Sequence, residues 1–388
     1  MKPLRIVVVG TATTCPYAGM AWMHMQIAVG LKRLGHDVYY FETTSCWPLD
    51  PIRAAQVGDS DYALPYLERL ASDFGLNGKW AYRRSYGDKA WFGLTQLAAE
   101  DLLAHADAVI NVTGATRFAE ENLKVGRLVY LGTDPVIHEV RFLNNDLDTI
   151  SIIAEHQDFA TYGENIGTPE CCVPPLLGQR ARTRQPILVD LWDAGPPEKE
   201  TFTTVGNWKG DQGGVVFRGE SYSWSKDREF LKFIDLPKRI GQPLEFATGL
   251  EYLPSKIRQM LASNGWHLRD AHAMTLDPWP YRDYIRASRG EFTVAKDMNV
   301  RLRSGWFSER SACYLAAGRP VITQNTGFGT VLPTGEGLFA FDTMDEILAA
   351  FDAVKSDYVR HSRAARDIAH EYFRAETVLS QLLMDLGL

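Results

Sequence analysis

The segment at residues 300–324 limits the possible folds of this chain more than any other. Ser308 is a favourable N-cap residue, and the residues after it are good helix formers with a small, apolar face. Gly318 can adopt the left-handed conformation that ends a helix, and Pro320 prevents the helix from continuing. The Val-Ile pair at 321–322 predicts a short buried strand. The segment therefore predicts a short helix followed closely by a strand, a unit typical of α/β folds.

The amino-terminal end of this predicted helix has the properties of an anion-binding site. Its first backbone N–H groups have no acceptor within the helix, and Arg301, Arg303 and Arg310 are close in the sequence. The glycine-rich loop at residues 326–330 lets further backbone N–H groups approach a ligand. Because arginine matches phosphate oxygens well, these features together favour a diphosphate. The alternative is an ordinary helix–strand unit whose arginines are solvated.

The run Leu315-Ala-Ala-Gly-Arg-Pro-Val-Ile322, followed by Thr326-Gly327, resembles the nucleotide-sugar half of glycosyltransferases with the GT-B fold, of the family 4-like or CgeB-like kind. In that family a short helix with this ending lies under the diphosphate and ribose of the donor. Residues 30–38 are similar to the exit of the first helix in many GT-B enzymes. Cys313 occupies the position of the usual ribose-binding Glu, and Glu309, one helical turn earlier, is a possible substitute.

Length and composition indicate a folded protein with two domains. A chain of 388 residues suits two domains of about 150 to 200 residues each. The net charge of −7, with interspersed signs, argues against a nucleic-acid surface. No apolar run reaches the roughly 18 residues of a membrane span. Five cysteines without a framework spacing suit a reducing compartment, so we expect a cytoplasmic protein without an integral membrane segment.

The first half of the chain begins with a βαβ pattern. Residues 5–9 and 37–41 predict strands on either side of a helix at 20–34. Further strands are predicted at 107–112 and 127–131, which together favour a parallel sheet. The first loop lacks the Gly-x-Gly-x-x-Gly run of dinucleotide-binding proteins, so a nicotinamide oxidoreductase is disfavoured.

Residues 45–95 form an irregular region rich in Trp, Tyr and Pro. Helices are predicted at 64–74 and 91–105, with the aromatic run at 79–84 between them. Aromatic rings can stack on the apolar faces of sugars, so this run suits a sugar or aglycone pocket. Ordinary packing of an inserted helical pair explains it slightly better.

A Pro-, Gly- and charge-rich segment divides the chain. We predict a first Rossmann-like domain at 1–180 on the acceptor side, a linker at 181–200, a second Rossmann-like domain at 201–372 on the donor side, and a last helix at 373–388 that crosses back. The second half has predicted strands at 201–205, 215–217 and 291–295 and predicted helices at 224–233, 252–264, 280–286, 344–354, 357–373 and 376–386. The predicted fold class is α/β, with two parallel sheets facing across a cleft, which is the GT-B architecture.

Glycosyl transfer requires neutralisation of a diphosphate leaving group. The resemblance implies that helix dipole and basic side chains do this, so we expect neither a metal nor a cofactor. The predicted donor-binding residues are Lys226, Glu291, Lys296, Arg303, Ser308, Glu309, Arg310, Thr326, Gly327, Phe328 and Gly329. For Lys226 and Lys296, an exposed surface charge is the more common role. Glu291 is expected either to bind the ribose or to face solvent.

The acceptor must lose a proton, and a base is expected on the first-domain side of the cleft. Asp134 ranks first because it follows a predicted strand and precedes a proline. His138 on the same loop ranks second, and His24 in the first helix ranks third, since a lone helical histidine is more often structural. Because ligands gather at the carboxyl ends of strands, the loops that contain Thr13, Gly19 and Gly114 are also expected at the cleft. We list these three as acceptor-side or cleft-loop residues.

The leading interpretation is a metal-independent hexosyl- or related glycosyltransferase that uses a nucleotide-diphospho-sugar. Two alternatives are a sugar-nucleotide epimerase or hydrolase with the same architecture, and a non-catalytic sugar-nucleotide-binding protein. The binding-protein alternative is suggested by Cys313. The acceptor is not specified by the sequence: a small molecule and a surface glycan are both compatible.

Overall fold

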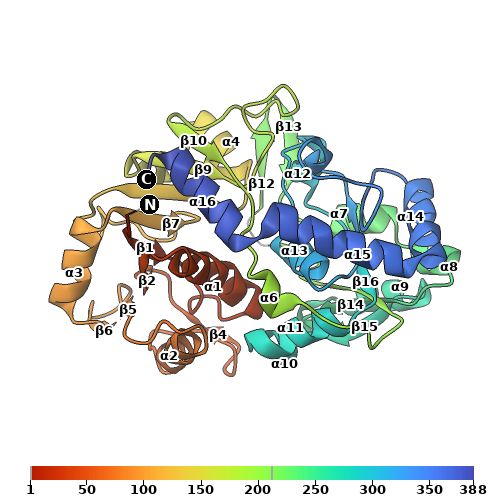
Figure 1. Cartoon of the computed structure of the whole chain (residues 1–388), viewed down its shortest axis with the longest axis horizontal. Helices are drawn as coiled ribbons and strands as arrows, with labels where there is room; N and C mark the ends of the chain where they lie inside the picture. The colour runs from red at the N-terminus through yellow and green to blue at the C-terminus, as the bar shows by residue number, and fades with distance from the viewer. Residues whose placement is uncertain (1, 211–212) are drawn as a thin grey trace.

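The structure is a computed structural model that describes residues 2–210 and 213–388. Two sheets, one in each half of the chain, lie beside each other and are surrounded by helices (Figure 1). The first half, coloured red to yellow, forms one side of the molecule, and the second half, green to blue, forms the other. This arrangement confirms the predicted α/β fold class with two parallel-sheet domains.

The first sheet has eight strands in the order β10-β9-β8-β7-β1-β2-β5-β6. Its strands are β1 (Arg5–Val9), β2 (Asp37–Glu42), β5 (Trp80–Arg83), β6 (Trp91–Gly93), β7 (Ala108–Val112), β8 (Leu128–Gly132), β9 (Asp158–Thr161) and β10 (Gln179–Arg182). The central strand β1 pairs in parallel with β2 and β7. Strands covered on both faces need continuous apolar runs, which explains why the sequence predicted β1, β2, β7 and β8 correctly. The helices of this half are α1 (Ala18–Arg33), α2 (Ala63–Asp73), α3 (Gln96–His105), α4 (Ile137–Leu143), α5 (Leu147–Ala154) and α6 (Val189–Trp192), and a small hairpin joins β3 (Leu49–Asp50) to β4 (Ala55–Gln56).

The aromatic region of the first half differs from the prediction. The aromatic run at 79–84, for which packing of a helical pair was preferred to a sugar pocket, belongs to β5, which pairs with β2. Trp91 opens the antiparallel edge strand β6 instead of a helix. The helix begins only at Gln96, after Thr95 caps it by accepting the N–H of Ala98. Aromatic residues are enriched in strands, so the composition that suggested a pocket indicates a sheet edge here.

The second sheet has six parallel strands in the order β15-β14-β11-β16-β17-β18. They are β11 (Phe202–Val205), β14 (Leu244–Thr248), β15 (His267–Asp270), β16 (Gly290–Thr293), β17 (Val321–Gln324) and β18 (Leu338–Phe341). The α-helices are α7 (Asp227–Lys232), α8 (Leu236–Arg239), α9 (Ser255–Ser263), α10 (His272–Thr275), α11 (Pro278–Ala287), α12 (Asp297–Arg301), α13 (Glu309–Ala316), α14 (Met344–Ser356), α15 (Tyr358–Ile368) and α16 (Ala375–Leu386), with short 3-10 turns η1 (Leu250–Tyr252) and η2 (Phe328–Thr330) and a π-helical turn η3 (Ala369–Phe373).

Several features of the second half were not predicted. The run at 215–217, expected to be a sheet strand, lies in β12 (Gly214–Phe217), which forms a separate antiparallel hairpin with β13 (Glu220–Ser223). Because β13 of this hairpin extends to Ser223, the next helix begins at Asp227 and not at residue 224 as expected. The strand β15 was missed because its sequence is polar and largely exposed at the sheet edge. The mostly buried β14 and the strand β18 were not predicted either.

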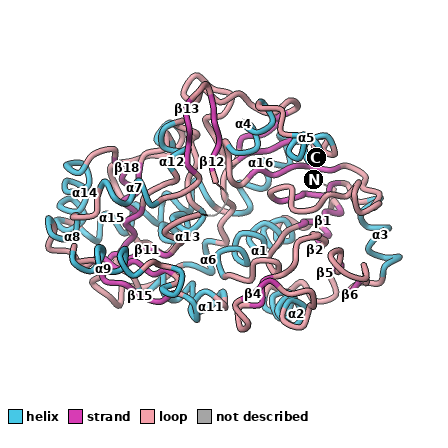
Figure 2. Tube along the Cα trace, turned by 180° about the vertical axis from the view of Figure 1, so that it is seen from behind, coloured by secondary structure: helices cyan, strands magenta, loops and turns pink. Residues whose placement is uncertain are grey.

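The last helix packs on the first half of the molecule, where Figure 1 shows α16 in blue above the red helix α1. A Cβ on Gly30 of α1 would lie 2.5 Å from Leu379 and 2.9 Å from Ala375, so the glycine permits this close approach. Figure 2 shows α1 and α13, distant in the sequence, next to each other at the centre of the molecule. The two helices belong to one continuous hydrophobic core that spans both halves.

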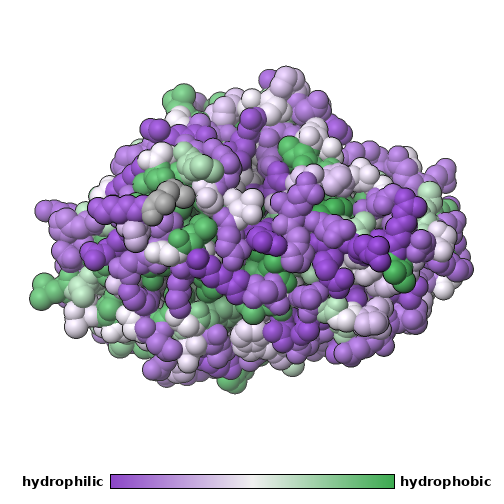
Figure 3. All heavy atoms as spheres, viewed as in Figure 1, coloured by the Kyte–Doolittle hydropathy of each residue, from purple (hydrophilic) through white to green (hydrophobic). Residues whose placement is uncertain are grey.

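Hydrophilic residues predominate on the face shown in Figure 3, and hydrophobic residues form smaller separate groups between them. Among the described residues, no helix combines the length and the apolar character that crossing a membrane requires.

Candidate active site

A cleft of about 970 Å³ lies between the two halves of the molecule. Its walls are the segments that follow the carboxyl ends of strands in both sheets, together with the start of α13. The first half contributes Tyr17, Gly19, Met20, Met23, Thr133, Asp134, Tyr162 and Gln185, and the second half contributes Val205–Gly210, Asp227, Thr248, Gly249, Tyr252–Pro254, Ile257, Ala271, His272, Thr275, Tyr281, Trp306 and Ser308–Arg310. Open α/β sheets bind their ligands at this end of their strands.

The helix α13 begins at the wall of the cleft. Ser308 has the extended backbone of an N-cap residue, with φ −80° and ψ 134°, but its side chain makes no capping hydrogen bond. Ser308, Glu309 and Arg310 all line the cleft, so the structure brings together these three predicted donor-site residues. The first N–H groups of a helix have no intrahelical acceptor, and the dipole favours negative charge there. This end of α13 can therefore bind an anion.

Arg310 is fixed by hydrogen bonds to the second sheet. Its Nε donates to Glu291 Oε1 at 2.5 Å, Nη1 donates to the carbonyl of Val205 at 2.7 Å, and Nη2 donates to Thr293 Oγ1 at 2.9 Å. Burial opposes the charged form, but the Glu291 carboxylate outweighs it and raises the pKa of Arg310 above its ordinary value. Glu291 is fully buried, so it neither faces solvent nor reaches the cleft, contrary to both expected roles.

Lys296 connects the two halves of the molecule. Its Nζ donates to Asp134 Oδ1 at 2.7 Å and lies 3.2 Å from the centre of the Trp224 ring. Burial lowers the pKa of Lys296, and the carboxylate of Asp134 opposes this shift. Asp134 lines the cleft, with 39% of its side chain exposed, whereas Lys296 does not line it. The first-ranked candidate base is therefore at the cleft but already bound to a cation.

Lys226 lies in the electrostatic range of Arg310 and Lys296. Burial lowers the pKa of Lys226 well below its usual value, and these two positive charges lower it further. Its Nζ has no hydrogen-bond or ion-pair partner among the residues that the structure describes. The carboxylates of Glu291 and Asp134 oppose this shift, but they are already paired with Arg310 and Lys296. Lys226 does not line the cleft itself. A partly buried amino group beside two other cations, with no counter-ion of its own, is a position that an anionic ligand would complete.

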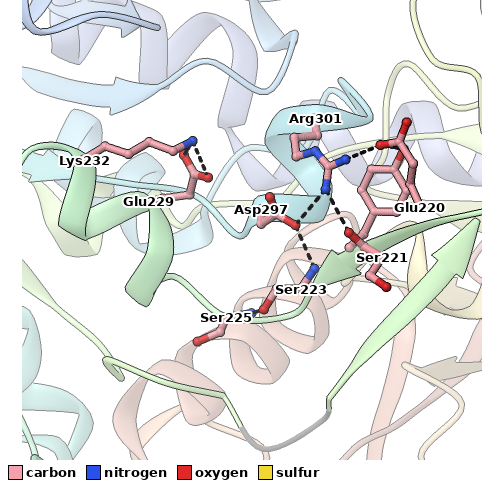
Figure 4. A network of polar contacts seen from close by, with 9 residues as sticks. Glu220, Ser221, Ser223, Ser225, Glu229, Lys232, Asp297 and Arg301 are labelled. Carbon is pink, nitrogen blue, oxygen red and sulfur yellow. Dashed lines mark hydrogen bonds and ion pairs between the residues drawn. The ribbon is translucent and has the colours of Figure 1, made fainter.

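A network of polar contacts fixes the hairpin that leads to Lys226 (Figure 4). The backbone N–H of Ser223 donates to Asp297 Oδ2 at 2.7 Å. Arg301 Nη1 donates to the carbonyl of Ser221 at 2.9 Å and thus connects α12 to β13. These contacts hold the end of the hairpin against α12, and the lysine follows three residues later in the chain.

Glu309 is oriented by a chain of hydrogen bonds. Its Oε1 accepts the Nε2–H of Gln26 at 2.7 Å. The carbonyl oxygen of Gln26 in turn accepts N–H groups from Leu188 and the Trp192 ring, both at 3.0 Å. Burial raises the pKa of Glu309 to about 7. The thiol of Cys313 also contacts Glu309, at 3.5 Å, so the position of the usual ribose-binding Glu faces this cluster.

The two candidate histidines are held away from the cleft. His24 is fully buried: its Nε2 accepts the N–H of Thr11 at 3.2 Å, and its Nδ1 is 2.7 Å from the carbonyl of Met20. His138 Nδ1 is hydrogen-bonded to the hydroxyl of Tyr130. Burial lowers the pKa of each histidine to about 4. Neither lines the cleft, so the structure gives both a packing role instead of the expected base role.

The glycine-rich loop expected at the donor contacts the first half of the molecule instead. Asn165 Nδ2 donates to the carbonyls of Gly327 and Arg303, at 3.0 Å each. Phe328 is buried against Phe307, with ring centres 5.1 Å apart. Neither Arg303 nor the run Thr326 to Gly329 lines the cleft. The short turn η2 directs this loop toward residues 163–168, which the local sequence could not reveal.

Two of the three expected first-half loop residues are also outside the cleft wall. The backbone N–H of Thr13 donates to the buried carboxylate of Glu42 at 2.9 Å. Gly114, at φ 67°, packs close to Tyr130. Gly19, in the first turn of α1, does line the cleft.

Most of the cleft wall was not predicted. The largest omissions are residues 206–210 after β11, the segment after β14, and the side chains of Tyr162 and Gln185. The first of these carried a signal: a glycine-containing loop directly after a predicted strand is the place where the strand-end rule expects a ligand. The others follow strands that had not been recognised or loops without a motif.

No family model and no curated protein matches the chain. Several solved structures do share its architecture over its whole length. One is an α-glucosyltransferase in complex with UDP and a 13-mer DNA with a central A:G mismatch, which has 9% identity, 100% coverage of both chains and a TM-score of 0.59. Another is Anabaena HepE in complex with UDP-glucose, with 11% identity, 99% coverage of both chains and a TM-score of 0.59. The chain has the GT-B fold.

A glycosyltransferase from Rickettsia africae ESF-5 shares the fold too, with 9% identity, a TM-score of 0.56, and coverage of 99% of this chain and 98% of that one. At these identities the likeness concerns the fold. The predicted GT-B recognition is confirmed at that level, and the activity has to be argued from the site.

Proposed function

We propose that this GT-B protein is a glycosyltransferase that moves a sugar from a nucleotide-diphospho-sugar to a hydroxyl or another nucleophile of an acceptor. In this proposal residues 201–372 bind the donor, residues 1–180 bind the acceptor, 181–200 link them, and 373–388 attach the second domain to the first. The three fold neighbours described above support the reaction class. Two of them were solved with UDP or UDP-glucose.

The observation that carries the proposal is the unpaired charge of Lys226. It lies within electrostatic range of Lys296 and of Arg310, which is in the first turn of α13. A diphosphate would supply the negative charge that this cluster lacks, and its oxygens would accept hydrogen bonds from the unpaired N–H groups of the helix. No metal ion is required for this neutralisation, so we propose a metal-independent, cofactor-free reaction.

The chemistry exchanges one bond for another at the anomeric carbon. The bond from this carbon to the diphosphate oxygen breaks, and the nucleoside diphosphate leaves with the electron pair. The acceptor oxygen forms the new bond and loses its proton. Among the candidate bases Asp134 is the one at the cleft, and its release from Lys296 would free it to take that proton.

The acceptor is proposed to be a small molecule or a glycan. The net charge of −7 and the pI of about 5.8 disfavour a polyanionic nucleic acid. Cysteines without a framework spacing support action in the cytoplasm.

Thermal unfolding with a panel of UDP-, GDP-, dTDP- and CMP-sugars tests the donor assignment. A ligand that binds only the folded state raises the apparent stability by mass action. We expect one diphospho-nucleotide family to raise the Tm, and Lys226→Met to abolish most of that rise. CMP-sugars, which carry a single phosphate, are the matched control. If no nucleotide sugar changes the Tm and none is consumed, the proposal is wrong.

Consumption of the donor separates the alternative functions. A transferase releases the nucleoside diphosphate faster when an acceptor is present, and a hydrolase releases it at the same rate with water alone. An epimerase converts the sugar, and a binding protein leaves the donor intact. Following both nucleotide and sugar by chromatography distinguishes all four.

A further inference from the structure

Two buried polar atoms at the cleft have no hydrogen-bond partner. They are the hydroxyl of Tyr162 and Oε1 of Gln185. Both residues line the cleft, and each is only 2% exposed. A buried polar group without a partner destabilises the fold, so such groups at a cleft wall point to a ligand that satisfies them.

The orientation of the Gln185 amide is fixed by its neighbour. Its Nε2 donates to the backbone carbonyl of Phe307. A carbonyl can only accept, so the amide cannot be turned around without losing this bond. Gln185 therefore presents an acceptor atom to the cleft.

Glu309 offers a further open atom on the same wall. Gln26 cannot turn either, because its carbonyl oxygen accepts two N–H groups, and its Nε2 therefore faces Glu309 Oε1. The other carboxylate oxygen, Oε2, accepts no hydrogen bond from the described residues. The Glu309 charge, after burial, raises the pKa of the Tyr162 phenol, so the two groups lie within electrostatic range.

We propose that Tyr162, Gln185 and Glu309 form a subsite that binds hydroxyl groups of the transferred sugar. This inference rests on the proposed function. Tyr162 can donate or accept, Gln185 Oε1 accepts, and Glu309 Oε2 accepts when ionised. A sugar hydroxyl both donates and accepts, so two neighbouring hydroxyls would satisfy all three atoms.

The position of the subsite favours the donor sugar over the acceptor. Glu309 directly precedes Arg310 at the start of α13, where the diphosphate is proposed, and the transferred sugar is the group bonded to that diphosphate. The subsite also draws on both halves of the molecule, since Tyr162 and Gln185 follow strands of the first sheet. Sugar binding would therefore connect the two walls of the cleft.

The test compares each nucleoside diphosphate with its sugar conjugate. Calorimetric titration gives the Kd for the pairs UDP and UDP-glucose, GDP and GDP-mannose, and dTDP and dTDP-glucose. For the pair that binds, Tyr162→Phe should raise the Kd of the sugar conjugate about 2- to 10-fold, the effect of one neutral hydrogen bond, and leave the Kd of the bare nucleotide unchanged. Gln185→Met is the second variant and should act in the same way.

Tyr66→Phe is the matched control, because the Tyr66 hydroxyl is also buried and unpartnered but is outside the cleft. It should change neither constant. Equal changes for bare and sugar-bearing nucleotide, or no change for either, would overturn the subsite and leave the transferase proposal intact. An increased acceptor KM with an unchanged donor ratio would also overturn it, since the atoms would then bind the acceptor. Wild-type protein that binds none of the pairs would overturn both proposals.

Discussion

Two sets of polar groups meet at the start of α13, and they differ in whether their hydrogen bonds are complete. Under the helix, Arg310 is held by a carboxylate, a hydroxyl and a backbone carbonyl. In the second set, Lys226 lies within electrostatic range of Arg310 and has no partner among the described residues. At the cleft itself, Ser308 makes no capping bond and Glu309 keeps one oxygen without a hydrogen bond. The first set is part of the folded framework, whereas the second set is available to a ligand.

The difference separates stability from binding. Removal of one member of a buried ion pair leaves the other charge buried without a partner, which is strongly destabilising. Removal of a charge that has no partner leaves no other group unpaired, and it can relieve repulsion between like charges. The two sets should therefore respond differently to substitution, and the predictions below test that contrast.

The largest effect is expected for Arg310→Met. The variant leaves the Glu291 carboxylate buried without its cation, so the free energy of unfolding should fall by about 3–5 kcal/mol in urea denaturation. The double variant Arg310→Met with Glu291→Met should recover most of that loss, because replacement of both members by apolar groups is often neutral. A single variant as stable as the wild type would show that the pair is not part of the framework.

Glu309→Gln should change how stability depends on pH. Burial raises the pKa of Glu309 from 4.5 to about 7 in the folded state. A carboxyl with a raised folded pKa favours folding when protonated, so this contribution is complete below pH 4.5 and is lost as the pH rises through 7. The loss is at most about 3 kcal/mol and is reduced by solvent at the cleft. The amide variant should therefore gain stability relative to wild type at pH 8 but not at pH 4.

Thermal unfolding at several pH values measures this effect. Glu139, in the first half, also has a pKa raised to about 7 by burial, so Glu309→Gln should remove only part of the pH dependence of the wild type. The exposed Glu68→Gln is the control and should follow the wild type at every pH. If Glu309→Gln also follows the wild type, its carboxyl is not desolvated.

Lys226→Met should weaken nucleotide binding without loss of stability. A charge-assisted hydrogen bond to a phosphate is worth about 1.5–3 kcal/mol, so the Kd of a nucleoside diphosphate should rise about 10- to 100-fold. The free energy of unfolding should stay equal or increase, because the variant removes a buried charge that faces other cations. Lys238→Met, at an exposed lysine bound to Asn264, is the control. A destabilised Lys226 variant with normal binding would reverse the contrast.

The sequence predicted the parts of the site that depend on local chemistry. The N-cap at Ser308, the helix stop at Gly318 and the strand after Pro320 all occur as predicted. They could be predicted because capping, left-handed glycine and proline restriction act within a few residues. The βαβ pattern was equally readable, since strands buried on both faces need apolar runs.

The rest of the site depends on contacts between distant segments. The loop at residues 326–329 has the composition of a phosphate loop, but Asn165 from the other half binds its backbone. His24 has the chemistry of a base, but both of its ring nitrogens are hydrogen-bonded to backbone groups of nearby residues. Gln185 belongs to a loop without any sequence motif, and the folded path of that loop places it at the cleft. A local pattern identifies what a residue could do, whereas tertiary contacts decide whether it can reach a ligand.

The smallest effect tests the contrast between two helix N-caps. Thr343 caps α14 with a side-chain bond to the N–H of Glu346, so Thr343→Ala should cost about 1 kcal/mol of stability and leave binding unchanged. Ser308 makes no such bond, so Ser308→Ala should leave the free energy of unfolding within about 0.5 kcal/mol of the wild type. It should instead raise the Kd of the nucleoside diphosphate about 2- to 10-fold, because a free hydroxyl at the cleft is lost. If Ser308→Ala destabilises the fold as much as Thr343→Ala, the serine is a structural cap and belongs to the framework set.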